Sequence, residues 1–382
     1  MLLLPLVKPS IGDINGDQIS ELLVQSRDPG SSAMIGLVQY DPKNQDYATG
    51  QGLCVLGAQK GAIPGQGIQG SWPIGLNDTY IVLDALSSDS PSSLFVQNQG
   101  VQPPAVGVLQ MNSSKLAWET IWIAEKSIPS FVPGASSWPM STKDVYLNLG
   151  DINGDGLPEL LIQSSVTAQI ALLQYNSTEK AFGVLQILSN AVPPLGSGYP
   201  SWQMHLQDTY YSVGDINGDG QAEILVQSHN DKNNPYISLL QYDKVKGLSC
   251  IWGTVHSIAG ASAGTAWTMH IDDKYTVIDD LNQDGIPELM VQSTYINPSS
   301  LHDALVGIVK YQGNTANTGG LVSTIVRNST IPGLSLSTYW QIYPIDTYLS
   351  VGDMNADGIP DILVRDNVGV AGYKVALISA FE

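Results

Sequence analysis

Strand-sized runs of apolar residues recur along the whole chain and are separated by segments rich in glycine, asparagine, serine and proline. Residues 160–164 read Leu-Leu-Ile-Gln-Ser, and residues 224–228 read Ile-Leu-Val-Gln-Ser. Short apolar runs bounded by turn residues predict β-strands, and no segment shows a persuasive helical period. The pattern therefore predicts an all-β protein.

These runs fall into groups of four that repeat along the sequence. The first run of a group carries a Tyr-x-x-x-Gly-Asp motif, as at residues 210–215, and the second is of the Leu-Val-Gln-Ser type. The third run is exemplified by residues 238–242, and a more varied fourth by residues 249–253. Four short strands that recur in this way predict the blade of a β-propeller.

A nine-residue motif lies between the first two strands of five of these groups. Residues 151–159 read Asp-Ile-Asn-Gly-Asp-Gly-Leu-Pro-Glu, with oxygen-bearing side chains at positions 1, 3, 5 and 9. The glycine at position 6 permits a sharp turn; only the first copy lacks it and has Gln18 instead. A single copy is compatible with an ordinary Asx turn. Five copies in one register instead indicate calcium-binding loops, because Ca²⁺ takes six to eight oxygen ligands.

We expect about five structural Ca²⁺ ions, because each loop connects the first two strands of its own blade. The motif differs from an EF-hand, which places its last acid at position 12 between helices. The predicted ligands are Asp13, Asn15, Asp17, Glu21, Asp151, Asn153, Asp155, Glu159, Asp215, Asn217, Asp219, Glu223, Asp280, Asn282, Asp284, Glu288, Asp353, Asn355, Asp357 and Asp361.

A tryptophan motif precedes the loops and identifies a sixth repeat. The tryptophan lies thirteen residues before the first loop aspartate, with an aspartate six residues after it and a tyrosine eight residues after it. Trp72 has the same aspartate and tyrosine spacing, but Ala85 occupies the position of the first loop ligand. Serine replaces the last acid of this loop, so we predict that residues 85–93 bind no metal. The tryptophans with the full spacing are Trp138, Trp202, Trp267 and Trp340.

The repeats predict one six-bladed β-propeller domain over residues 1–382, with loops that start near residues 13, 85, 151, 215, 280 and 353. Residues 1–6 are too few to form an outer strand and return to the first inner strand, since neighbouring strands lie about 4.8 Å apart. We therefore expect a three-stranded sixth blade with residues 374–381 at its edge. The ring would close by packing of the first and sixth blades, as a monomer or as a dimer through this edge.

The formal net charge of −19 reflects mainly the predicted loops, which hold 15 of the 35 acidic residues. Five bound Ca²⁺ ions would bring the net charge to −9. So few basic residues exclude nucleic acid as a partner, and no apolar run is long enough to span a membrane. We expect the protein to be secreted or in the secretory pathway, with the cytoplasm as the alternative. The four sequons occur at about the frequency of chance, and the two cysteines, Cys54 and Cys250, are expected to be buried free thiols.

The loops and strands together resemble the FG-GAP/VCBS repeat family, the propellers of integrin α-subunits and of several fungal lectins. The resemblance covers the whole chain, and it implies calcium loops between the first two strands of each blade. It implies little about activity, because the family includes lectins, adhesion heads and domains attached to enzymes. Two features depart from the family: the altered second loop and the absence of a tryptophan motif before the first loop.

The candidate ligand residues lie where the repeats differ. The connections between blades, which follow the tryptophans, are expected on the face opposite the calcium loops, beside the connections between second and third strands. At fixed spacing the tryptophans themselves more often pack between blades than bind a ligand. Arg365 replaces a glutamine that ends the second strand of the other five repeats. The candidates are Trp202, His205, Trp267, His270, Trp340, Tyr343 and Arg365.

Three functions agree with these patterns. The first is a calcium-stabilised, lectin-like propeller that binds a small ligand, with carbohydrate the leading class. The second is a fungal secondary-metabolite cyclase of the hetero-Diels–Alder type, which needs one apolar pocket and no covalent catalysis. The third is an adhesion module that binds a protein. No hydrolytic or redox constellation is present in the sequence, so its catalytic residues, if any, are not identified.

Overall fold

The computed structural model describes residues 11–17, 19, 21–26, 33–40, 53–67, 70–87, 90–99, 103–293, 305–313, 320–332, 339–352, 359–366 and 374–378. These residues form 33 strands and no α-helix. None of the described segments is a helix of the length and apolarity needed to cross a membrane. The chain divides into two compact units, Met1–Leu188 and Ser189–Glu382.

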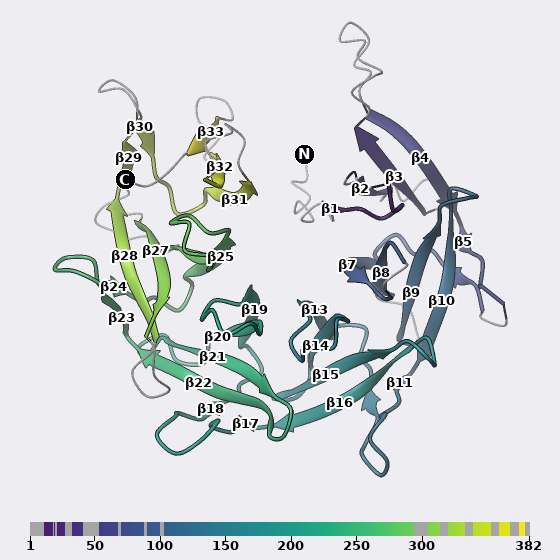
Figure 1. Cartoon of the computed structure of the whole chain (residues 1–382), viewed down its shortest axis with the longest axis horizontal. Helices are drawn as coiled ribbons and strands as arrows, with labels where there is room; N and C mark the ends of the chain where they lie inside the picture. The colour runs from purple at the N-terminus through teal and green to yellow at the C-terminus, as the bar shows by residue number, and fades with distance from the viewer. Residues whose placement is uncertain are drawn as a thin grey trace, which may run out of the picture. The chain divides into compact units, whose positions relative to one another are not determined.

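The first unit contains three four-stranded antiparallel sheets, in which strands adjacent in sequence are adjacent in space. We number these sheets blades 1 to 3 (Figure 1). Blade 1 comprises β1 (Ile11–Gly12), β2 (Glu21–Ser26), β3 (Met34–Tyr40) and β4 (Leu53–Lys60). Blade 2 comprises β7 (Thr79–Ala85), β8 (Ser92–Gln97), β9 (Ala105–Asn112) and β10 (Ala117–Glu125). Blade 3 comprises β13 (Val145–Gly150), β14 (Glu159–Gln163), β15 (Gln169–Asn176) and β16 (Ala181–Ser189).

The second unit contains blades 4 to 6, built in the same strand order. Blade 4 comprises β19 (Thr209–Gly214), β20 (Glu223–Ser228), β21 (Tyr236–Asp243) and β22 (Gly247–Val255). Blade 5 comprises β25 (Lys274–Ile278), β26 (Glu288–Gln292), β27 (Leu305–Gln312) and β28 (Gly320–Asn328). Blade 6 comprises β31 (Thr347–Gly352), β32 (Asp361–Arg365) and β33 (Val375–Ile378).

Short antiparallel ribbons contain the tryptophans and lead into the inner strands of blades 2 to 6. In the first unit they are β5 (Ala62–Ile63) with β6 (Trp72–Pro73), and β11 (Ser127–Ile128) with β12 (Trp138–Pro139). In the second unit they are β17 (Ala191–Val192) with β18 (Trp202–Gln203), β23 (Ser257–Gly260) with β24 (Trp267–Thr268), and β29 (Thr330–Pro332) with β30 (Tyr339–Gln341). β23 also pairs with β28 in parallel, which attaches this ribbon to the outer edge of blade 5.

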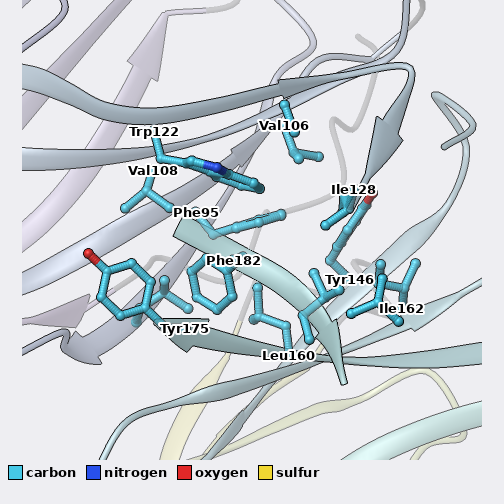
Figure 2. Packing of buried hydrophobic residues seen from close by; sticks show 14 of the residues in the cluster. Phe95, Val106, Val108, Trp122, Ile128, Tyr146, Leu160, Ile162, Tyr175 and Phe182 are labelled. Atoms are coloured by element: carbon cyan, nitrogen blue, oxygen red, sulfur yellow. The ribbon is translucent and has the colours of Figure 1, made fainter. Parts of the chain in front are cut away.

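Blades within a unit pack face to face, which explains why each second strand contains three consecutive apolar residues. All six residues of β20 are buried, because a sheet covered on both faces exposes neither set of alternating side chains. Figure 2 shows the core that joins blades 2 and 3, where Phe95 lies between Tyr146 and Phe182. The ring centroids of Phe95 and Phe182 lie 5.9 Å apart in an edge-to-face arrangement, a favoured geometry for aromatic pairs.

Six consecutive sheets of this kind place the protein in the all-β, six-bladed β-propeller class, as the sequence predicts. The described part of blade 6 has three strands, with β33 inside the predicted edge segment. Residues 1–6 and 379–382 lie outside the described residues. Both cysteines are free. Cys250 is buried as predicted, whereas Cys54 is only partly buried because it lies on the outer strand β4.

Candidate functional site

The loop between β19 and β20 folds around its own carboxylates. The backbone N–H groups of Asp219 and Gly220 donate hydrogen bonds to the two carboxylate oxygens of Asp215, over 3.0 and 2.8 Å. Glu223, fully buried at the start of β20, accepts the backbone N–H of Ile216 and the side-chain amide of Asn217. The turn therefore brings the carboxylates of positions 1, 5 and 9 together.

Other loops repeat this arrangement. A carboxylate oxygen from each of the three acidic positions lies within 4.8 Å of the others in three loops: Asp13, Asp17 and Glu21; Asp215, Asp219 and Glu223; and Asp280, Asp284 and Glu288. The third loop has the corresponding hydrogen bonds, including Gly156 N–H to Asp151 and Ile152 N–H to Glu159. In the sixth loop, Asp361 is buried at the start of β32, whereas Asp353, Asn355 and Asp357 lie outside the described residues.

The electrostatics of the loops fit a hard divalent cation. Burial, followed by the charges of Asp219 and Asp215, raises the pKa of Glu223 to about 9. Burial also raises the pKa of Glu159 to about 8, with a smaller contribution from Asp155 and Asp151. Such carboxylates need a positive partner to remain ionised together. Carboxylate and amide oxygens are the ligands that Ca²⁺ prefers.

The second loop is closed without a carboxylate cluster. The backbone N–H of Ser87 donates to the hydroxyl of Ser90, and the backbone N–H of Ser90 donates to the carbonyl oxygen of Ser87. The same segment packs on the first loop, since the N–H of Ser92 donates to the carbonyl oxygen of Asp13. Among the described residues, no group of three acidic side chains occurs here.

Each tryptophan of the connecting ribbons is tied to the aspartate six residues later. The indole Nε1–H donates to one carboxylate oxygen, Oδ2, over 2.8 to 3.1 Å, and the backbone N–H three residues after the tryptophan donates to the same oxygen. Each of these aspartates therefore accepts both a side-chain donor and a backbone donor. The pairs are Trp72 with Asp78, Trp138 with Asp144, Trp202 with Asp208, Trp267 with Asp273 and Trp340 with Asp346.

In blades 1, 2, 4 and 5, a glutamine near the end of the second strand joins the blade to the next connection, a role that was not predicted from the sequence. Gln97 of blade 2 donates to the carbonyl oxygen of Asp144, in the connection that enters blade 3, over 2.9 Å. Gln25, Gln227 and Gln292 make the corresponding bonds to the connections that enter blades 2, 5 and 6. We call these four side chains the glutamine bridges. Their signal in the sequence was the recurrence of glutamine at one strand position.

A cleft of about 430 Å³ lies in the second unit, where segments from blades 4, 5 and 6 come together. Blade 4 contributes residues from its first strand, β19, and the residue that directly follows its second strand, β20. The segments that lead into blades 5 and 6 contribute the rest. Its lining residues are Thr209, Tyr211, His229, Asp272, Asp273, Lys274, Pro344 and Ile345. Six of the eight side chains are polar.

Burial and neighbouring charges shift the pKa values of two side chains in the cleft. Burial raises the pKa of Asp273 to about 7, although the N–H groups of His270 and Trp267 act in the opposite direction. Burial and then the charge of Asp273 raise the pKa of Tyr211 to about 12, so that this phenol stays protonated at neutral pH. The Tyr211 hydroxyl donates to Gln227 over 3.2 Å, and its ring meets Tyr275 edge to face.

None of the seven candidate ligand residues from the sequence belongs to the lining of this cleft. Trp202 and Trp267 are buried, and Trp202 stacks on Tyr236 with ring centroids 4.5 Å apart. Trp340 is less buried. His270 and Tyr343 precede lining residues by two and one positions on the same connections.

Two further candidates are partly exposed. The Nδ1 atom of His205 lies 3.7 Å from the buried carboxylate of Asp208. Arg365 ends β32 and pairs with Thr347 of β31. The ligand roles of all seven residues stay predictions. His229 and its cleft neighbours became visible as a group only when the fold brought three repeats together.

No family model matches the chain, and no curated protein matches it either. The resemblance to the FG-GAP/VCBS family therefore stays a prediction. Among solved structures, a protein from Lactobacillus plantarum is similar at 12% identity and a TM-score of 0.45, over 97% of this chain and 83% of that one. A periplasmic gluconolactonase from Pseudomonas aeruginosa is similar at 11% identity and a TM-score of 0.39, over 85% of this chain and 74% of that one. Likeness at this level supports no inference about activity.

Proposed function

We propose that the protein is a calcium-stabilised propeller that binds one small polar ligand, of the carbohydrate class, in the cleft of the second unit. The observation that carries the proposal is the lining of this cleft. It combines two carboxylates, an ammonium group, an imidazole, two hydroxyls and one aromatic ring. Its volume of about 430 Å³ lies in the range of small-molecule sites.

Carbohydrates suit this set of groups because a sugar presents many hydroxyls and one less polar ring face. Asp272 accepts hydrogen bonds, Lys274 donates them, and Thr209 can do both. The aromatic side chain in the lining, Tyr211, supplies a surface for a sugar ring. Pro344 and Ile345 add apolar side chains to the lining.

Calcium belongs to the proposal as a structural component. The loops of blades 1, 4 and 5 each gather three carboxylates. The loop of blade 3 has the same residue types with corresponding hydrogen bonds, so all four loops offer a donor set suited to Ca²⁺. The motif at residues 353–361 adds a fifth site by sequence, so we propose five ions in each chain. Bound ions would hold each first hairpin in place. None of the residues that line the cleft belongs to a calcium loop.

A secreted or secretory-pathway location accompanies this proposal. Extracellular calcium sites commonly bind with dissociation constants of about 10⁻⁴ to 10⁻³ M, which matches the calcium supply outside the cell. The side chain of the sequon residue Asn77 is exposed, as is that of Asn328. Glycan attached at these asparagines in protein from its native source would support the location, and unmodified chains would speak against it.

The test is ligand binding by the intact, calcium-loaded chain. A glycan array should show binding to a limited set of sugars, and calorimetry with a hit should give one site per chain. Lys274→Ala and Tyr211→Ala should weaken that binding at least tenfold. Lys143, an exposed lysine on the connection into blade 3, provides the matched control, and Lys143→Ala should leave the affinity unchanged. Equal affinity in all four proteins would exclude the cleft as the site.

A single-site enzyme is the second candidate, favoured by the lack of repetition in the cleft. Lys274 directly follows the aspartate of its tryptophan motif. In the other motifs, the residue at this position is Thr79, Val145, Thr209 or Thr347. A multivalent lectin would repeat its ligand groups, whereas an enzyme needs one pocket. Mass spectrometry of each bound compound after incubation separates the two: a changed mass or isomer would establish turnover, and unchanged compound would leave binding alone.

A further inference from the structure

In each blade whose loop ends in a glutamate, the third strand places a side chain directly opposite that glutamate. In blade 1, Glu21 pairs with Gln39, and in blade 3, Glu159 pairs with Gln174. In blade 4, the partner of Glu223 is Gln241. The same register therefore brings one third-strand residue to each cluster of carboxylates.

In blades 1, 3 and 4 this residue is a glutamine that binds the loop through its amide. Gln39 donates to Asp17 over 2.6 Å and to Glu21 over 2.9 Å. Gln174 donates to Asp155 over 2.7 Å, and Gln241 donates to Asp219 over 2.5 Å. A neutral amide orients a carboxylate while leaving the negative charge of the loop intact.

Blade 5 differs, because a lysine takes the place of the glutamine. Leu289 pairs with Val309, which places Lys310 opposite Glu288. Lys310 is partly buried on β27, beside the cluster of Asp280, Asp284 and Glu288. Burial raises the pKa of Glu288, and the positive charge of Lys310 acts in the opposite direction.

We propose that Lys310 is a built-in counter-ion that makes the fifth loop the weakest calcium site of the described loops. This inference rests on the proposed role of calcium. An ammonium beside the loop lowers its net negative charge and repels an incoming Ca²⁺ ion. At a separation of several ångströms in a solvated site, this repulsion weakens binding roughly tenfold. The same charge stabilises the metal-free loop, so blade 5 depends less on calcium than blades 1, 3 and 4.

The experiment measures calcium binding by calorimetry, with calcium chloride added to intact protein that has been freed of metal by EDTA and dialysis. In the wild-type protein, one binding step should be weaker than those of the other described loops, and Asp284→Asn should remove that step. Lys310→Gln should tighten it roughly tenfold. The reciprocal change, Gln241→Lys, should weaken calcium binding by the loop of blade 4 and so produce a second weak binding step.

Melting temperatures provide an independent readout of the same charge. Without metal, Lys310→Gln should melt below the wild-type protein, because the carboxylates of the fifth loop lose their counter-ion. Gln241→Lys should melt above it under the same conditions. At saturating calcium, these differences should shrink or reverse. If Lys310 had only a structural role, Lys310→Gln would instead lower the melting temperature equally with and without calcium.

The failures of the two proposals are distinguishable. If no loop binds calcium in any variant, the structural role of calcium is wrong, and the proposal for Lys310 fails with it. If the loops bind calcium but Lys310→Gln changes neither the weak step nor the metal-free melting temperature, only the proposal for Lys310 is overturned.

Discussion

The indole Nε1–H of Trp138 donates a hydrogen bond to Asp144 over 3.0 Å, and the backbone N–H of Ser141 donates to the same carboxylate oxygen over 2.9 Å. Both side chains are buried, with exposed fractions of 2% each. One aspartate therefore holds a tryptophan and a turn in the connection that enters blade 3.

Trp138→Phe should lower the free energy of unfolding by about 1 to 3 kcal/mol more than the loss of ring size alone, because a buried carboxylate oxygen loses a donor. Trp118 provides the control: it is 1% exposed, and within the described residues its Nε1 has no hydrogen-bond partner. Urea unfolding of Trp138→Phe and Trp118→Phe measures the difference. Equal destabilisation by the two variants would show that the bond contributes nothing.

The glutamine bridge of blade 2 predicts a local effect of mutation. Gln97→Ala removes the donor to the buried carbonyl oxygen of Asp144, which should cost about 1 to 3 kcal/mol. Hydrogen exchange of amides in residues 141–146 should accelerate, because the connection into blade 3 loses its attachment to blade 2. Gln66 is exposed, and Gln66→Ala should leave this exchange unchanged. Unaltered exchange in Gln97→Ala would contradict the bridging role.

Chelation of metal should lower the melting temperature strongly. A ligand that binds only the native state at about a hundred times its dissociation constant contributes roughly 2.7 kcal/mol per site. Asp155→Asn should reproduce part of the loss in calcium-containing buffer. Asp89→Asn should not lower the melting temperature, because Asp89 belongs to the second loop, which is predicted to bind no metal. A melting temperature that stays constant in excess EDTA, with metal loss confirmed by elemental analysis, would refute the prediction.

Asp273 should make stability depend on pH in a direction unusual for an aspartate. Burial raises its pKa from 3.8 to about 7, so the native state retains a proton that the unfolded state releases. The stabilising contribution is complete below pH 3.8 and is lost as the pH rises through about 7. It amounts to roughly 4 kcal/mol at most.

The measurement compares wild-type protein with Asp273→Asn, which keeps an oxygen acceptor for Trp267 and His270 but cannot ionise. The difference in unfolding free energy between the two proteins should change between pH 4 and pH 7 and be flat above pH 8. A difference that is independent of pH over the whole range would show that Asp273 does not titrate in this window.

The sequence predicted those parts of the molecule that depend on residues near one another in the chain. The loop of residues 215–223 closes through hydrogen bonds between residues at most seven positions apart. Both partners of each bond therefore lie within the nine-residue motif. The tie between Trp202 and Asp208 spans six positions and was visible as a fixed spacing. Strand order followed in the same way, since each sheet is built from consecutive hairpins.

The cleft and the glutamine bridges could not be predicted in the same way. Gln97 finds its acceptor 47 residues away, and the recurrence of glutamine gave no indication of that partner. Thr209, Lys274 and Ile345 belong to three different repeats, and only the packing of successive blades brings them to one cleft. Of the candidate residues predicted from the sequence, Trp202 and Trp267 are buried by packing, and none of the seven belongs to the lining of the cleft.

The glutamine bridges also order the events of synthesis. Each blade is made of consecutive hairpins, so its strands can pair as soon as they leave the ribosome, and domains generally fold in the order in which they emerge. The acceptors of Gln25, Gln97, Gln227 and Gln292, however, belong to residues made later. In a nascent chain, a bridging glutamine therefore lacks its acceptor until the next connection has been synthesised and accepts its hydrogen bond. The connections into blades 2, 3, 5 and 6 are therefore each synthesised after the glutamine to which they bond.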